Sequence, residues 1–225
     1  MSYARSRWGC DMRTFARSNP LFNSYRAELT MLKSIPLTST DFRGLLSPRF
    51  FKNFFPIPAT NQSYYEVATP DFELPDLTHN RRVHLRDYRG KQPVIVAFTR
   101  IFTEKQYCPL CFPHIVELNE RYQQFTDLGV EVLMVTSTDT RQSKIVVRDL
   151  DLKLPLLSDP DGQVFRAYRV GQALGAPLPA QFVLDRNGKL CYKHLFSFLE
   201  PNASIETLLE QAHSIAQPVP NEVIG

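Results

Sequence analysis

Cys108-Pro109-Leu110-Cys111 is the stretch that decides the fold, because it separates an apolar run from a helical pattern. The run over residues 94–98 contains no polar residue and is typical of a buried strand. After the stretch, apolar and aromatic residues recur at three- and four-residue spacing from His114 to Phe125, which predicts a helix. The two cysteines therefore lie where a buried strand gives way to a helix.

This position favours an ionised thiol. The first N–H groups of a helix lack partners and the helix dipole places partial positive charge there, so the pKa of a cysteine at this point falls. The thiolate is the nucleophile, and Cys111 lies one helical turn from Cys108, close enough to form a disulfide with it once Cys108 has reacted. A Cys-x-x-Cys pair that opens a helix among alternating strands and helices is typical of a redox site.

Two other interpretations of the pair stay open. A zinc ion could bind Cys108, Cys111 and His114, although a closed structural site needs four ligands and the usual second pair of ligands is missing from the sequence. The cysteines could also pack in the core, as free cysteines often do.

Composition bounds the class of protein. The chain has 225 residues and 43% hydrophobic content, which fits one domain with extensions and a sizeable core. The net charge of +3 comes without a long Lys/Arg block, so we expect no nucleic-acid partner. Four scattered cysteines, Cys10, Cys108, Cys111 and Cys191, favour a reducing compartment over a secreted disulfide scaffold. No apolar run approaches the roughly 18 to 20 residues of a membrane span, and no signal peptide is recognisable.

Residues 1–30 are rich in Arg and Ser and poor in acidic residues, a composition typical of an organelle transit peptide. A flexible tail, or an extension ahead of an alternative start at Met31, explains the same composition. We therefore expect a cytoplasmic protein, or one in an organelle stroma or matrix if this segment is a transit peptide.

Residues 31–64 form an aromatic segment. One apolar helical face is predicted from the spacing of five residues, Leu46, Phe50, Phe51, Phe54 and Phe55. We expect this helix to pack on its own domain or to pair two subunits in a homodimer. We do not expect it to contact a membrane surface.

The rest of the chain alternates between strands and helices. Strands are predicted at 130–136, 155–159 and 181–185, an Asn-Gly type turn at 186–189, a returning strand at 190–194, and helices around 145–150, 162–168 and 205–215. This order predicts an α/β fold, with a mostly parallel central sheet, helices on both faces and an antiparallel edge hairpin. We assign residues 65–215 to this domain and residues 216–225 to a tail. No pattern calls for a metal or an organic cofactor.

Four motifs together resemble the peroxiredoxin-like (AhpC/TSA, redoxin) family of the thioredoxin superfamily. They are Thr69-Pro70-Asp71-Phe72-Glu73-Leu74, the strand at 93–99, the Cys-Pro-x-Cys stretch, and the segment 178–188. The resemblance covers roughly residues 65–215. It implies a thioredoxin-like three-layer fold, thiol peroxidase or thiol–disulfide oxidoreductase activity, and a thioredoxin-type electron donor.

The resemblance also assigns site residues. It implies that Pro179 is a cis proline facing the cysteines, and it matches Arg100 to an arginine of related Cys-Pro-x-Cys proteins; the alternative for Arg100 is a solvated surface residue. Typical peroxiredoxins carry Pro-x-x-x-Thr-x-x-Cys, whereas Ile101 and Lys105 stand at those places here, and Thr103 is out of register. This departure favours thiol–disulfide chemistry over efficient peroxide reduction.

The hypothesis that follows is a dithiol cycle. Cys108 attacks a peroxide or a protein disulfide, and Cys111 then attacks Cys108 to leave an internal disulfide. Lys105 and Arg100 could lower the pKa of Cys108, and Pro113 is expected to bend the helix or delay its start. Cys191 is an alternative resolving thiol if the fold brings it near. The competing hypothesis is a thioredoxin-fold interaction or assembly protein whose aromatic helix binds a partner and whose disulfide is structural or vestigial.

Overall fold

The computed structural model describes residues 48–60 and 69–216. The predicted extension at 1–30, with Cys10, lies outside the described residues, as do Leu46 and the boundaries placed at residues 30 and 64. Among the described residues, no helix is long and apolar enough to cross a membrane.

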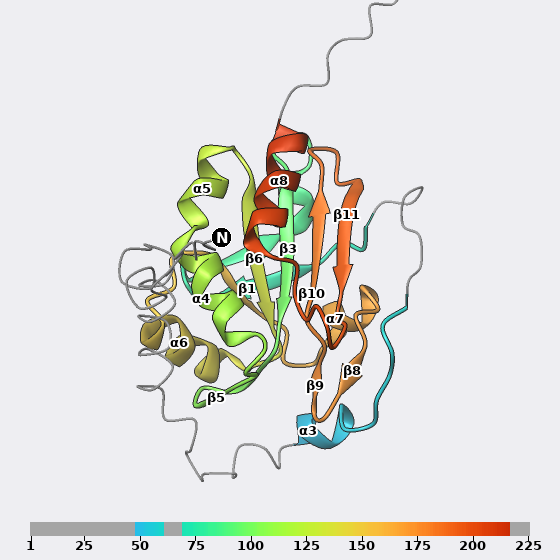
Figure 1. The fold of residues 1–225 in the computed structure, drawn as a ribbon. Coiled ribbons are helices and arrows are strands. Elements are labelled where there is room, and N and C mark those ends of the chain that lie inside the picture. The colour runs from blue at the N-terminus through green and yellow to red at the C-terminus, as the bar shows by residue number, and fades with distance from the viewer. Residues whose placement is uncertain (1–47, 61–68, 217–225) are drawn as a thin grey trace, which may run out of the picture. The chain divides into compact units, whose positions relative to one another are not determined.

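A seven-stranded sheet forms the centre of the domain (Figure 1), in the order β11-β10-β3-β6-β7-β1-β2. Its strands are β1 Glu73–Asp76, β2 Arg81–His84, β3 Val94–Thr99, β6 Glu131–Thr136, β7 Leu156–Ser158, β10 Ala180–Leu184 and β11 Leu190–Leu195. The neighbours β3, β6 and β7 run parallel, and antiparallel strands border them on both sides. The predicted α/β architecture is confirmed, and the β1–β2 hairpin adds a second antiparallel edge.

Helices connect and cover the strands. They are α3 Pro48–Lys52, α4 Phe112–Glu120, α5 Tyr122–Asp127, α6 Thr140–Asp149, α7 Gln163–Ala167 and α8 Ile205–Ala216, with a 3₁₀ turn η2 at Leu85–Tyr88. The helix predicted after the cysteines breaks in two at Arg121, whose backbone leaves the helical region with φ −97° and ψ 7°. Gly129 ends the pair in a left-handed conformation with φ 71°.

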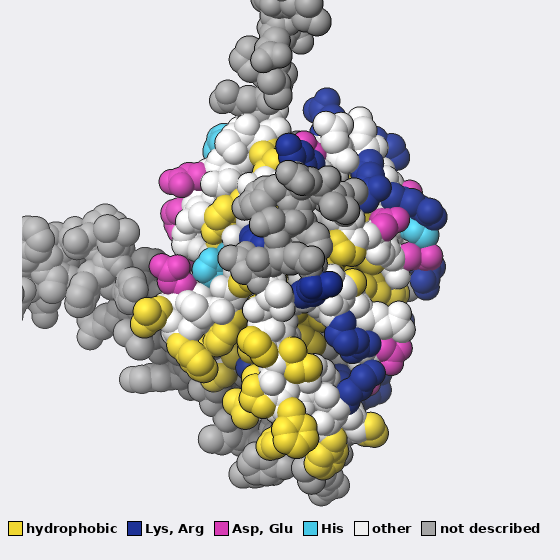
Figure 2. All heavy atoms as spheres, turned by 90° about the vertical axis from the view of Figure 1, so that its right-hand side faces the viewer, with side chains coloured by type: hydrophobic (Ala, Val, Ile, Leu, Met, Phe, Trp, Pro, Cys, Tyr) yellow, Lys and Arg dark blue, Asp and Glu magenta, His cyan; other side chains and the backbone are white. Residues whose placement is uncertain are grey.

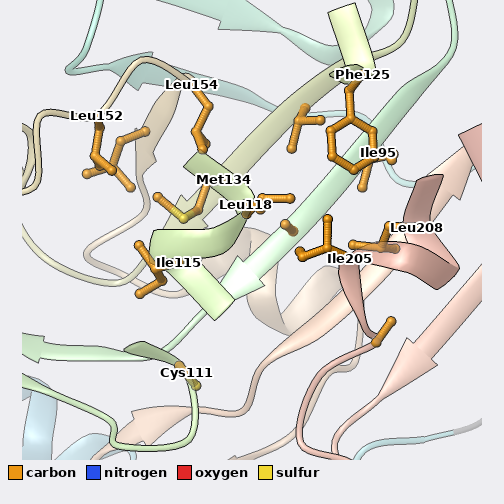
Figure 3. Packing of buried hydrophobic residues seen from close by; sticks show 14 of the residues in the cluster. Ile95, Cys111, Ile115, Leu118, Phe125, Met134, Leu152, Leu154, Ile205 and Leu208 are labelled. Atoms are coloured by element: carbon orange, nitrogen blue, oxygen red, sulfur yellow. The ribbon is translucent and has the colours of Figure 1, made fainter. Parts of the chain in front are cut away.

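Alternate residues of β3 face two separate cores, because successive side chains of a strand point to opposite faces of the sheet. Ile95 and Ala97 face α4, α5, α6 and α8. On this side Ile115 and Leu118 of α4 pack with residues of β3, β6 and α8 (Figure 3), and Cys111 lies at the margin of the same cluster.

The opposite core is aromatic. The Phe98 ring lies 4.9 Å from that of Phe165, 5.0 Å from that of Tyr168 and 5.7 Å from that of Phe182, measured between centroids. Tyr168 also donates its hydroxyl to the carbonyl of Pro70, 2.9 Å away. The central strand is therefore fixed from both sides, which holds its C-terminal end, where the cysteines follow, in a defined place.

Two small hairpins extend beyond this end of the sheet. They are β4 Ile101–Thr103 with β5 Gln106–Tyr107, and β8 Gln172–Ala173 with β9 Ala176–Pro177. The segment between β3 and the cysteines is thus an ordered hairpin.

The aromatic helix is shorter than predicted. It ends at Lys52, and Pro56 and Pro58 keep the following chain extended. Phe50 packs at Gly175 in the β8–β9 turn, while Phe51, Phe54 and Phe55 remain exposed. The expected packing against the domain is therefore only partial.

Candidate active site

The cysteines lie in a turn that joins the β4–β5 hairpin to α4. The carbonyl of Cys108 accepts the N–H groups of Cys111 and Phe112, each at 3.0 Å, and the carbonyl of Cys111 accepts that of Ile115 at 2.9 Å. The helix begins at Phe112, so Cys108 precedes its first turn. Pro113 stands within that first turn, where a missing N–H leaves no helical hydrogen bond unmade.

The two thiols are free, buried and unequal. The thiol of Cys111 donates to the sulfur of Cys108, and this contact is the main reason that the pKa of Cys108 falls to about 6. The N–H groups of Leu110 and Cys111 and the charge of Arg100 act in the same direction, whereas burial opposes them. The same hydrogen bond, together with burial, raises the pKa of Cys111. The geometry thus prepares Cys108 as the thiolate and keeps Cys111 protonated, an asymmetry suited to sequential attack.

Arg100 is buried beside the thiols, with 7% of its surface exposed. Its guanidinium donates to the carbonyls of Ala173 and Leu174 in the β8–β9 hairpin, and it lies 4.8 Å from the ring centroid of Phe102. Burial lowers its pKa, and the charges of Cys108 and Cys111 counter that effect. The alternative of a solvated surface arginine is therefore wrong. Arg100 joins the β8–β9 hairpin to the redox site, where its charge lowers the pKa of Cys108.

Pro179 lies at the same end of the sheet. Ala180 pairs with Phe98, so Pro179 stands opposite the end of β3, from which the chain runs on to Arg100. The expected cis bond is not found, because the Leu178–Pro179 peptide bond is trans. The trans form is the one that X–Pro bonds favour, by about 0.5 to 1 kcal/mol.

Thr103 and Lys105 lie at the β4–β5 turn and bond to each other there. The hydroxyl of Thr103 accepts the N–H of Lys105 at 3.2 Å, which holds it within the hairpin. Lys105 is exposed, and its effect on the pKa of Cys108 stays a prediction. The charge of Arg100 does lower that pKa.

His114 lies in the first turn of α4, and its ring is largely buried. Its ring bonds to the carbonyl of Ala203, and burial lowers its pKa to about 4, so it is neutral near pH 7. No group of three His, Cys, Asp or Glu side chains in the described part of the chain could hold a metal ion, which removes the zinc interpretation of Cys108, Cys111 and His114.

Cys191 lies at the other end of the sheet. Leu190 pairs with Leu184, and Leu184 pairs with Val94 at the start of β3, whereas the dithiol follows the end of that strand. Five steps along the strand correspond to about 16 Å. Cys191 is an exposed residue, and partial desolvation of its sulfur raises the pKa of its thiol. The strand pairing therefore does not bring it near Cys108 as a resolving thiol.

Asn202 and Arg49 support the site and were not predicted. Asn202 donates to the carbonyl of Leu110 at 3.0 Å and is itself held by the buried Gln181, also at 3.0 Å. Arg49 donates to the carbonyls of Phe102 and Ser137, beyond the ends of β3 and β6. A polar residue in a loop and a cation in a short helix give no sequence signal for such contacts, which join segments 53 to 92 residues apart.

Comparison with known proteins identifies a matching family and several relatives. The AhpC/TSA family matches residues 66–193, more than half of the chain. The thiol-disulfide oxidoreductase ResA of Geobacillus kaustophilus is 35% identical over 165 residues, covering 71% of this chain and 83% of that protein. ResA of Bacillus thuringiensis is 30% identical over 134 residues, with 58% and 70% coverage. A candidate peroxiredoxin of Mycobacterium tuberculosis is 30% identical over 129 residues, with 54% and 78% coverage.

Solved structures share the fold. A candidate thiol:disulfide interchange protein DsbE of Chlorobium tepidum has 25% identity and a TM-score of 0.53, covering 67% of this chain and 96% of that one. The mitochondrial 2-Cys peroxiredoxin of Plasmodium falciparum has 19% identity and a TM-score of 0.57, with 66% and 91% coverage. With the dithiol at the end of β3, these similarities show that the chain belongs to the AhpC/TSA family and is a thiol oxidoreductase with a thioredoxin-like fold.

Proposed function

We propose that the protein reduces disulfide bonds through a cycle of Cys108 and Cys111. The observation that carries this proposal is the unequal pair of thiols, because one sulfur is a thiolate near neutral pH while its neighbour keeps its proton. The ResA relatives, which are named thiol-disulfide oxidoreductases, support it.

The cycle balances in two steps. The Cys108 thiolate attacks one sulfur of a substrate disulfide, forming a mixed disulfide and expelling the other sulfur as a thiolate. Cys111 then gives its proton to the solvent or to the departing sulfur and attacks Cys108, which releases the second substrate thiol. Two electrons have passed to the substrate, and the Cys108–Cys111 disulfide remains. A dithiol donor of the thioredoxin type returns two electrons and resets the pair.

Disulfide exchange is favoured over peroxide reduction by the groups around Cys108. Thr103, the nearest threonine upstream of Cys108, is bound into the β4–β5 turn, and Ile101 is fully buried. Nη2 of Arg100 bonds to both backbone carbonyls, whereas its buried Nε has no hydrogen-bond partner among the described residues. The threonine donor of typical peroxiredoxins is therefore missing beside Cys108, and stabilisation of the charge that develops on a peroxide oxygen would rest on Arg100.

Peroxide reduction is the second candidate. The buried charge of Arg100 beside the thiols favours it, because a cation stabilises both the thiolate and an anionic leaving group. In that reaction Cys108 becomes a sulfenic acid, and attack by Cys111 releases water and forms the same disulfide.

One experiment separates the two. Fully reduced protein is mixed at pH 7 with hydrogen peroxide or with hydroxyethyl disulfide, and mass spectrometry follows formation of the Cys108–Cys111 disulfide. We expect rapid reaction with the disulfide and, with peroxide, a rate no greater than that of free cysteine. The reverse order of rates would establish a peroxidase. Reaction with neither substrate would favour the interaction or assembly hypothesis.

A further inference from the structure

Exposed apolar side chains gather around the dithiol. In the described part of the chain, every large hydrophobic side chain that is strongly exposed belongs to one of four segments that adjoin the site. We call these residues the apolar collar: Phe51, Phe54, Phe55, Ile57, Leu110, Leu174, Phe198 and Leu199. The last two are 88% and 95% exposed. Single exposed hydrophobic side chains are scattered over the surface of most proteins, whereas a group of them at one end of the molecule marks an interaction surface.

Hydrogen bonds fix one flank of the collar to the redox turn. Leu110 lies between the two cysteines, and its carbonyl accepts the side-chain amide of Asn202. The loop that carries Phe198 and Leu199 directly precedes Asn202 and is closed by a bond of 2.9 Å from the N–H of Glu200 to the hydroxyl of Ser197. Phe198 also stacks edge-on against Phe196, with ring centroids 5.2 Å apart. The backbone of this flank is therefore held in place by hydrogen bonds, although the side chains of Phe198 and Leu199 are exposed to solvent.

The other flank is connected through Arg100. The β8–β9 turn carries Leu174, whose carbonyl and that of Ala173 accept the Arg100 guanidinium. Residues 48–57 are fastened to the same hairpin, since Ile57 and Gln172 exchange two backbone hydrogen bonds of 2.8 Å. The collar thus reaches Cys108 from both sides through ordered backbone.

Basic residues predominate on this second flank. Segments 48–60 and 162–179 contain Arg49, Lys52, Arg166 and Arg169, while Asp161 and Asp159, which interacts with the charge of Arg166, directly precede the second segment. The two latter arginines are exposed and line a cavity of about 260 Å³, whose apolar walls include Phe165. Figure 2 shows hydrophobic side chains over the lower part of this face with Lys and Arg beside them. An apolar segment with acidic side chains complements such a surface.

Taking disulfide reduction as the proposed function, we propose that the apolar collar binds an extended polypeptide whose disulfide is flanked by apolar and acidic side chains. Apolar side chains of the substrate cover the collar, and its carboxylates meet Arg166 and Arg169. The preferred substrate is then a protein disulfide presented in an exposed chain, and small disulfides such as hydroxyethyl disulfide react more slowly than such a substrate because they leave the collar uncovered.

Two cystine peptides of equal length test this proposal. One carries Phe and Glu beside its disulfide and the other Ser and Lys, and hydroxyethyl disulfide is the small reference substrate. The readout is the rate of Cys108–Cys111 disulfide formation in the full chain. Wild-type protein should prefer the Phe/Glu peptide about ten-fold or more, a difference that corresponds to about 1.4 kcal/mol.

Variants locate the effect. Phe51→Ser with Phe55→Ser, and separately Phe198→Ser with Leu199→Ser, should lower the rate ratio of the Phe/Glu peptide to hydroxyethyl disulfide about ten-fold. Arg166→Glu with Arg169→Glu should shift the preference toward the Lys peptide. Arg186→Ser, in the exposed turn at the far end of the sheet, is the matched control and should leave every ratio unchanged.

Equal rates for both peptides, or collar variants with the wild-type ratio, would overturn the collar as a substrate surface. A collar that instead binds vesicles of anionic phospholipid, with no effect on peptide rates, would also overturn it in favour of membrane contact. Failure to reduce any of the three disulfides is a different result, because it removes the proposed function itself.

Discussion

Cys111 should control the reactivity of Cys108 before any disulfide forms. The thiol of Cys111 is the largest influence that lowers the pKa of Cys108 to about 6. A hydrogen bond to a charged group contributes about 1.5 to 3 kcal/mol, and 1.36 kcal/mol corresponds to one pKa unit. Cys111→Ala should therefore raise the pKa of Cys108 by about 1 to 2. Cys111→Ser retains a donor at the same position and should keep the pKa low.

The assay is alkylation by iodoacetamide between pH 5 and pH 9, followed by peptide mass spectrometry that distinguishes Cys108 from Cys10 and Cys191. Since only the thiolate reacts, the rate falls as the pH drops through the pKa. At pH 6 about half of Cys108 is thiolate in the wild type, and the Ala variant should react roughly 5- to 50-fold more slowly. Identical pH profiles for wild type, Cys111→Ala and Cys111→Ser would refute the hydrogen bond as the cause.

Three further predictions concern the surroundings of the dithiol. Arg100→Met should raise the pKa of Cys108 less than Cys111→Ala does, because its charge ranks below that hydrogen bond, and the same alkylation profile measures it; an unchanged midpoint would contradict it. Gly175→Ala should lower the free energy of unfolding by about 1 to 2 kcal/mol from its left-handed backbone alone, and by more because the new methyl group overlaps the Phe50 ring, as urea denaturation would show. Asp139→Ala removes the capping box of α6 and should cost about 1 kcal/mol in the same assay, whereas Asp139→Asn should cost less.

The sheet could be predicted from the sequence because its strands are encoded locally. The segment 94–98 is a continuous apolar run, and 130–136 is nearly so, and both become buried parallel strands at the predicted positions. The redox pair could also be predicted from the sequence, because a Cys-x-x-Cys motif between a strand and a helix is recognised from neighbouring residues alone.

The surroundings of the site could not be predicted in the same way. Arg100 is a charged residue that sequence statistics place at the surface, and only its bonds to carbonyls 73 and 74 residues away allow its burial. The β8–β9 hairpin consists of two-residue strands, too short for any periodic signal. The break at Arg121 likewise carries no proline or glycine that would mark it.

The most direct test of the central claim is to trap the first step of the cycle. Reduced Cys111→Ser protein is mixed with hydroxyethyl disulfide at pH 7, and the site of the mixed disulfide is mapped by peptide mass spectrometry. Attack by a Cys108 thiolate predicts one stable adduct per chain, located on Cys108, and no adduct in Cys108→Ser. An adduct formed mainly on Cys191, or equal labelling of the two variants, would contradict Cys108 as the nucleophile.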